Sequence, residues 1–113
     1  MGLSAKAIKL SDSASRALDL LDRAGATRSI SRRVRDLKPV LLADCLHGEV
    51  VRKRFIPREL REEYGVDNLY VEDLPEFWRL LYSIAHEGAD RYILVLEIVD
   101  HRRYDRWFPG RGR

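Results

Sequence analysis

The first third of the chain alternates and then repeats its apolar residues in a way that predicts one strand and two helices. Residues 4–10 alternate polar and apolar side chains, as a short strand does. Ser11 is a suitable N-cap for a first amphipathic helix, which Gly25 ends. Thr27 is a suitable N-cap for a second, and Pro39 is expected to kink or split it. The two helices predict a helical hairpin.

The second half of the chain predicts strands. Residues 56–65 have the proline and glycine positions of a short helix. Residues 68–74, 75–84 and 91–99 are rich in β-branched, aromatic and leucine side chains and predict three strands. Residues 85–90 contain a turn glycine and predict a hairpin loop between the last two strands.

Alternation across this hairpin predicts two different faces. One face is uniformly apolar and is expected to pack on the helices; it consists of Trp78, Leu80, Tyr82, Ile84, Tyr92, Leu94, Leu96 and Ile98. The opposite face mixes Arg79, Arg91 and Glu97 with apolar residues and is expected to stay open. The predicted fold is therefore an α+β domain spanning residues 1–113, with an antiparallel sheet packed against an N-terminal helical hairpin. Residues 109–113 are expected to be a mobile basic tail.

Composition excludes several classes of protein. A single cysteine, Cys45, allows no internal disulfide and argues against a zinc site, which fits a reducing cytoplasm. The most apolar stretch, residues 92–99, is too short to span a membrane, and the first ten residues lack the apolar core of a signal peptide. The chain has 17 arginines and no glutamine, which suggests a heat-adapted source; a GC-rich genome is the alternative explanation for the arginines.

Charge is unevenly distributed along the chain. The formal net charge is +3, but residues 1–46 carry +4, residues 47–58 carry +3 and residues 101–113 carry +4, whereas residues 59–100 carry −8. If the basic ends of the chain meet in space, they would form a surface that attracts phosphates; the alternative is a surface of ordinary ion pairs.

Three segments resemble the RelE/ParE toxin superfamily. The run "KAIKLSDSASRALDLL" resembles its opening strand and helix, and "NLYVEDLPEFWRLLYSI" resembles the pattern "LYRVELPGGYRLIYRV". The run "VLEIVDHRRYDRWF" resembles a last strand followed by "HKxxYxR". Val71 departs from the pattern, because many relatives have arginine there. The long connector 47–67 is similar to archaeal branches of the group.

The resemblance implies a toxin of a type II toxin–antitoxin pair, but it leaves the activity open. RelE-type members cut mRNA on the ribosome without a metal or cofactor, and ParE-type members inhibit DNA gyrase. A relative that binds nucleic acid but has lost its activity is a third alternative. The partners expected under the leading hypothesis are ribosome-bound mRNA and a cognate antitoxin, with no membrane and no small-molecule cofactor.

The resemblance also names candidate catalytic residues. Arg79 would stabilise the charged transition state, and a guanidinium can hold a phosphate through two hydrogen bonds. His101 would transfer a proton, and Tyr104 would contact the RNA. Glu72 or Glu97 would be an alternative base. The residues expected to bind RNA are Arg52, Lys53, Arg54, Arg102 and Arg103.

Overall fold

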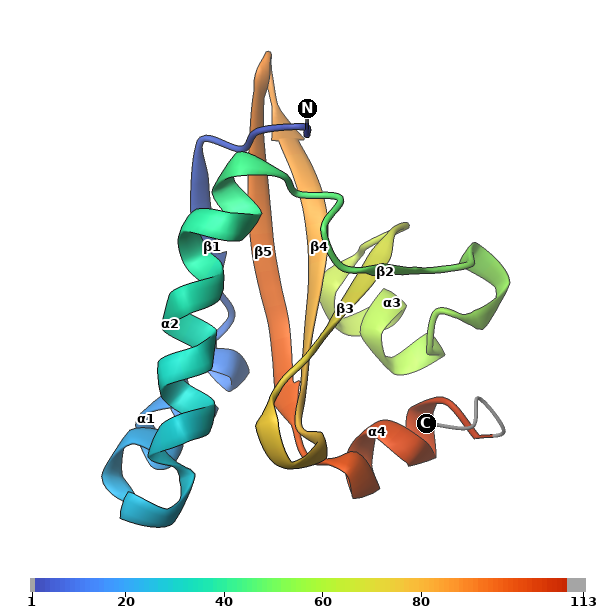
Figure 1. Ribbon diagram of the computed structural model, residues 1–113. Coiled ribbons are helices and arrows are strands. Elements are labelled where there is room, and N and C mark those ends of the chain that lie inside the picture. Colours follow the sequence, from blue (N-terminus) through green and yellow to red (C-terminus); the bar gives the residue numbers. More distant parts are fainter. Residues whose placement is uncertain (1, 110–113) are drawn as a thin grey trace.

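The computed structural model describes residues 2–109, which form a five-stranded mixed sheet with helices on both faces (Figure 1). The strand order is β1-β5-β4-β3-β2. Residues 110–113 of the predicted tail lie outside the described residues. In chain order the elements are β1 (Ala7–Leu10), α1 (Asp12–Arg23), η1 (Gly25–Thr27), α2 (Arg28–Ala43), β2 (Glu49–Val51), η2 (Lys53–Phe55), α3 (Arg58–Tyr64), β3 (Leu69–Asp73), η3 (Pro75–Phe77), β4 (Arg79–Glu87), β5 (Asp90–Val99) and α4 (His101–Trp107).

β3, β4 and β5 pair antiparallel, as predicted, and β2, a strand that was not predicted, pairs antiparallel with β3, but β1 pairs with β5 in parallel. The prediction of an all-antiparallel sheet was therefore wrong at this edge. The helical hairpin returns the chain so that β2 runs opposite to β1. The three reversals from β2 to β5 then leave β5 running in the same direction as β1. A backbone hydrogen bond of 2.9 Å from the Ser11 N–H to the Val95 carbonyl continues this pairing into the start of α1.

The predicted helical hairpin is confirmed and covers one face of the sheet (Figure 1). Ser11 caps α1, because its side chain accepts a hydrogen bond from the Ala14 N–H. Pro39 was predicted to kink or split the second helix, and it does not split it: α2 continues to Ala43, with the exposed Pro39 inside it. The buried residues between the hairpin and the sheet include Ala14, Leu21, Ile30, Leu37, Leu41, Leu80, Tyr82, Ile93, Val95 and Ile98.

The opposite face of the sheet is covered too, which corrects the expectation of an open face. α3 and α4 lie on this side (Figure 1), and their apolar side chains bury the sheet residues beneath them. The cluster comprises Val51, Ile56, Leu60, Leu69, Val71, Leu81, Leu96, Val99, Tyr104 and Phe108. Residues 101–108 are therefore a helix packed on the sheet and not a basic rim around an exposed surface.

A register shift between β4 and β5 explains why the predicted faces were only partly right. Leu81 pairs with Glu97, and the next residue, Tyr82, pairs with Val95. This extra residue in β5 reverses the alternation on one side of it. As a result Leu94 and Leu96 face α3 and α4, and not the helical hairpin as predicted. No helix among residues 2–109 is long and apolar enough to cross a membrane.

Candidate functional site

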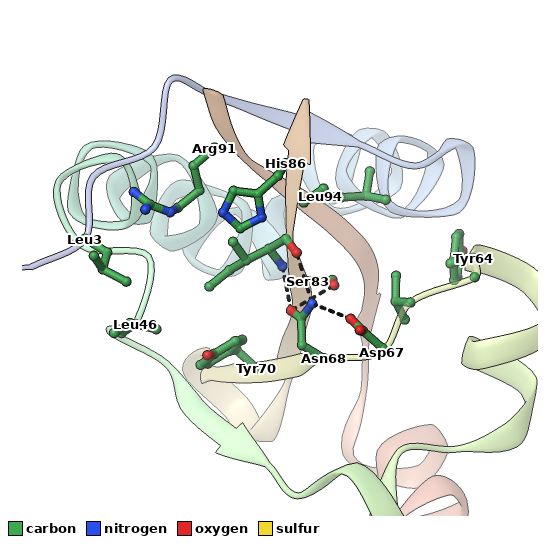
Figure 2. Close-up of a pocket in the computed structure, with 14 residues that line it drawn as sticks. Leu3, Leu46, Tyr64, Asp67, Asn68, Tyr70, Ser83, His86, Arg91 and Leu94 are labelled. Atoms are coloured by element: carbon green, nitrogen blue, oxygen red, sulfur yellow. Dashed lines mark hydrogen bonds between the residues drawn. The ribbon is translucent and has the colours of Figure 1, made fainter. Parts of the chain in front are cut away.

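A hollow of about 670 Å³ lies beside the N-terminal end of β3 (Figure 2). Asn68 closes part of it: its side-chain oxygen accepts from the Ile84 N–H at 2.7 Å, and its side-chain nitrogen donates to the Ile84 carbonyl at 3.0 Å. Asn68 thereby continues the β3–β4 pairing by one position with its side chain. The described lining, which includes His86 and Arg91, contains none of the predicted catalytic or RNA-binding residues. This hollow is thus separate from the site that the sequence predicts.

Arg79 lies at the start of β4, where α4 covers it. Its side chain is almost fully buried, and the whole residue is 5% exposed. The guanidinium Nε is 3.1 Å from Asp73 Oδ1 on the neighbouring strand, and Nη1 donates to the Trp78 carbonyl at 3.0 Å. Arg79 therefore does not project freely from an open face, as predicted, and a phosphate would have to compete with Asp73 for it.

The Tyr104 ring of α4 packs against the Arg79 guanidinium. The guanidinium carbon is 5.2 Å from the centre of the Tyr104 ring, within the range of a cation–π interaction. Tyr104 is 1% exposed and packs against Phe108, with ring centres 4.7 Å apart. The structure thus brings two of the three predicted catalytic residues together, but it buries Tyr104 in the core between α4 and the sheet.

His101, the third predicted catalytic residue, is exposed at the start of α4. Asp100 caps this helix by accepting from the Arg103 N–H at 3.0 Å, which fixes where the helix begins and where His101 leaves it. The His101 ring meets the ring of Phe77 edge-on, with centres 6.4 Å apart. Phe77 and Arg79 line a hollow of about 430 Å³ at the β3–β4 corner. His101 and Arg79 therefore both lie at this corner.

The basic segment 47–58 and residues 101–109 lie on the same side of the sheet, whereas the helices of the basic segment 1–46 lie on the other side. Val51 and Ile56, which flank η2, pack in one cluster with Tyr104 and Phe108 of the α4 segment. The Trp107 indole N–H contacts Glu59 Oε2 of α3 at 3.4 Å. The basic side chains of η2, α3, α4 and the residues next to them are exposed to solvent, and we call them the basic layer. They are Arg52, Lys53, Arg54, Arg58, Arg61, Arg102, Arg103 and Arg106.

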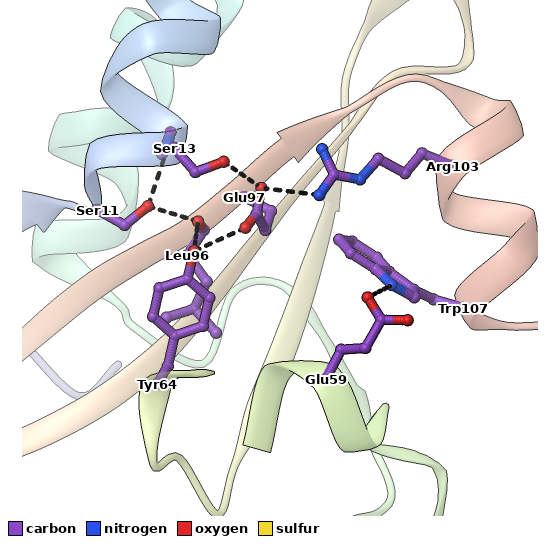
Figure 3. Close-up of polar contacts among 9 residues, drawn as sticks. Ser11, Ser13, Glu59, Tyr64, Leu96, Glu97, Arg103 and Trp107 are labelled. Carbon is purple, nitrogen blue, oxygen red and sulfur yellow. Dashed lines mark hydrogen bonds and ion pairs between the residues drawn. The ribbon is translucent and has the colours of Figure 1, made fainter. Parts of the chain in front are cut away.

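Glu97 is buried inside a polar network and is not available as a base (Figure 3). Its two carboxylate oxygens accept hydrogen bonds of 2.7 Å from the Ser13 hydroxyl and the Tyr64 hydroxyl. Arg103 Nη2 lies 3.9 Å from Oε1. Burial, and then the bond to Glu97, raises the pKa of Tyr64 well above its usual range. Glu97 therefore ties α1, α3 and α4 to β5.

Glu72 lies on the other face of the sheet. It pairs in register with Leu80, whose side chain faces the helical hairpin, whereas the neighbouring pair of Asp73 and Arg79 faces α4. The Glu72 carboxylate is buried, and its Oε2 is 2.6 Å from His47 Nδ1. Glu72 therefore cannot act together with Arg79 and His101, and its pairing with His47 could not be predicted from the sequence pattern.

The backbone conformation of the β3–β4 corner, residues 74–78, was not predicted. Glu76 and Phe77 both have left-handed backbones, with φ of 59° and 64°. A signal was present, because the pattern that residues 69–84 resemble has two glycines at these positions. Within the described residues, no group of three or more His, Cys, Asp and Glu side chains could hold a metal ion.

No family model matches the chain, and no curated protein and no solved structure shows significant similarity to it. The resemblance to the RelE/ParE superfamily therefore stays a hypothesis that depends on the quoted motifs. The class that the fold itself defines is an α+β protein, in which two N-terminal helices pack on a five-stranded mixed sheet of the described residues and a C-terminal helix packs on its other face.

Proposed function

We propose that this chain is a RelE-like toxin of a type II toxin–antitoxin pair and cuts ribosome-bound mRNA without a metal ion. The observation that carries the proposal is the basic layer described above. Segments more than 40 residues apart in the sequence, around Arg52–Arg54 and Arg102–Arg103, pack in one cluster beside the exposed His101. Arginine and lysine side chains gathered on one face attract phosphates and release their counterions.

The chemistry would be an attack of the RNA 2′-hydroxyl oxygen on the adjacent phosphorus. The hydroxyl gives up its proton, a cyclic phosphate forms, and the bond from phosphorus to the 5′-oxygen of the next nucleotide breaks, so that this oxygen leaves and takes up a proton. This reaction needs a group that accepts and donates protons. It also needs cations that stabilise the negatively charged transition state. His101 is exposed and would exchange the proton. Arg79 would supply positive charge at the floor of the corner hollow. Tyr104 would act as a positioning residue for Arg79, because its burial keeps it from touching RNA.

The burial of Arg79 and Tyr104 favours a second candidate function. With Arg79 paired to Asp73 and 5% exposed, the same basic layer could bind nucleic acid without cutting it. This candidate is a toxin relative without catalysis. It predicts RNA binding that weakens steeply with salt, with no cleavage on the ribosome.

The proposal includes a cognate antitoxin as partner. Such a protein would cover apolar side chains that the described structure leaves exposed on the β1 and α1 side. They include Leu20 of α1, which is 64% exposed, and Leu10 of β1, which is 39% exposed. A bound partner would raise the free energy of unfolding by an amount that grows with the logarithm of its concentration divided by its Kd.

Mapping of mRNA cuts on translating ribosomes tests the proposal, with the wild type, His101→Ala and Arg33→Ala compared. His101 is exposed, so its loss should leave the fold intact, and Arg33 is an exposed arginine of α2 on the other face. We expect cuts with the wild type and with Arg33→Ala, and none with His101→Ala. Intact mRNA with a folded wild type would reject the nuclease, and DNA-damage signalling upon expression would then identify gyrase as the target.

A further inference from the structure

The β3–β4 corner has a backbone that side-chain-bearing residues rarely adopt. Glu76 has φ 59° and ψ 35°, and Phe77 has φ 64°. Such conformations persist where the surrounding structure imposes them, and they concentrate at functional sites. Here a tight turn imposes them: the Leu74 N–H donates to the Trp78 carbonyl at 2.9 Å, and the Trp78 N–H donates to the Pro75 carbonyl at 3.3 Å.

Burial of the side chain does not explain this strained conformation. Phe77 is 68% exposed, the highest value among the described large apolar residues that are exposed. Its described ring contact is the edge-on one with His101, which is also exposed. A glycine would form the same turn with less strain. The fold alone therefore gives no reason for an aromatic ring at this position.

We propose that Phe77 is the platform on which an unpaired RNA base stacks, which rests on the function proposed above. Aromatic rings bind single-stranded nucleic acid in this way, because every base has a flat face. The ring borders the hollow of about 430 Å³ that Arg79 also lines, and it touches His101. A base on Phe77 would place its nucleotide next to the histidine assigned to proton transfer.

Charge around the corner sets the direction in which the nucleotide binds. Asp73 and Glu76 line the same hollow, and their carboxylates repel a phosphate. The phosphate is therefore assigned to the α4 side of the hollow, where Arg79 lies against Tyr104 and His101 begins the helix, and the base to the Phe77 side.

Binding of two RNA probes to three variants tests the platform. The probes are a labelled single-stranded RNA of about 12 nucleotides and a fully abasic chain of the same length, which keeps the sugars and phosphates. The variants are Phe77→Gly, Phe77→Trp and the matched control Glu76→Gly. Both glycine variants suit the left-handed backbone, so their melting temperatures should equal or exceed that of the wild type. Loss of folding therefore does not confuse the result.

We expect the wild type, Phe77→Trp and Glu76→Gly to bind the intact RNA about tenfold more tightly than the abasic chain. Phe77→Gly should lose this preference and keep its affinity for the abasic chain. If Phe77→Gly retains the wild-type preference, the platform is excluded, and Phe77 then serves a partner other than RNA. Cleavage on the ribosome is measured separately, so a binding platform can survive the failure of the nuclease proposal. Binding of neither probe by the wild type would overturn the platform, whereas the nuclease proposal is decided by the map of cuts on the ribosome.

Discussion

The guanidinium carbon of Arg79 lies 5.2 Å from the centre of the Tyr104 ring, so α4 packs in part against a charged residue of β4. Among the described residues of α4, Tyr104 is buried. The position of α4, and with it that of His101 at its start, therefore depends on a residue that was predicted to touch substrate. Changes at Arg79 should affect both stability and activity, and the two effects have to be measured separately.

We expect Arg79→Ala to lower the free energy of unfolding by about 1–2 kcal/mol, because it removes the contact with Tyr104 and its own packing. The ion pair with Asp73 adds little, since the Asp73 side chain is 57% exposed and solvent screens it. Urea denaturation measures the change. Asp73→Asn is the control that removes only the charge, and it should cost less than Arg79→Ala. An equal loss in both variants would mean that the ion pair, and not the contact with Tyr104, stabilises α4.

A second prediction concerns Glu97, whose carboxylate joins three helices to β5. Glu97→Gln keeps the size of the side chain but replaces one acceptor oxygen with an NH2 donor. In the wild type, the Ser13 and Tyr64 hydroxyls donate to the two oxygens, so one of them would then face a donor. We expect the free energy of unfolding to fall by about 1–2 kcal/mol, because hydrogen bonds to a charged acceptor become weaker ones to an amide. Glu87→Gln, at an exposed position at the end of β4, should change it little. A neutral effect at Glu97 would show that the network adds no stability.

Much of the architecture could be predicted because its signals are local. The N-cap Ser11 and the helical apolar spacing gave α1 and α2, and β3 and β5 followed from their apolar runs. The register shift beside Leu81 could not be predicted, because it depends on the pairing of two strands and not on either sequence alone.

The candidate site was harder to predict than the fold. The cap of α4, Asp100, was visible in the sequence, but the helix has only seven residues, and an apolar strand precedes it. Once α4 is formed, Tyr104 and Phe108 must be buried, and they close the face that was expected to be open. The alternation of faces along β3 then separates Glu72 from Arg79.

The third prediction is a loss of stability at high pH that two tyrosines cause. Burial is the main reason that the pKa values of Tyr64 and Tyr82 are both raised above their usual range. An unfolded chain releases these phenol protons near pH 10, before the folded chain does, so the unfolded state is favoured as the pH rises further. Their contribution to stability is thus fully present below about pH 10 and is lost above it.

Urea denaturation at several pH values checks this prediction. The double variant Tyr64→Phe, Tyr82→Phe should be less stable than the wild type at pH 8, because it loses the hydrogen bonds to Glu97 and to the Cys45 carbonyl. Its stability should fall less steeply than that of the wild type between about pH 10 and 12. Exposed lysines titrate equally in both proteins and cancel in the comparison. Identical slopes would mean that these two phenols keep normal pKa values in the folded chain.

The fourth prediction concerns which arginines contact nucleic acid. Arg102 and Arg106 are exposed on α4, and Arg32 and Arg33 are exposed on α2, which covers the opposite face of the sheet. All four are surface arginines on helices, so replacing either pair with alanine changes the net charge equally. If phosphates contact the α4 layer, the double variant there should flatten the plot of log affinity against log salt by about two phosphate contacts.

The α2 pair provides the matched control, because general attraction between a basic protein and RNA weakens equally in both double variants. A difference in slope therefore reports direct phosphate contacts and not net charge. We expect the α2 variant to keep the wild-type slope while its affinity falls slightly. Equal changes in slope would show that RNA is held by diffuse charge, in which case the convergence of Arg52–Arg54 with α4 would be an ordinary charged surface and the corner at Phe77 would lose its phosphate-binding neighbour.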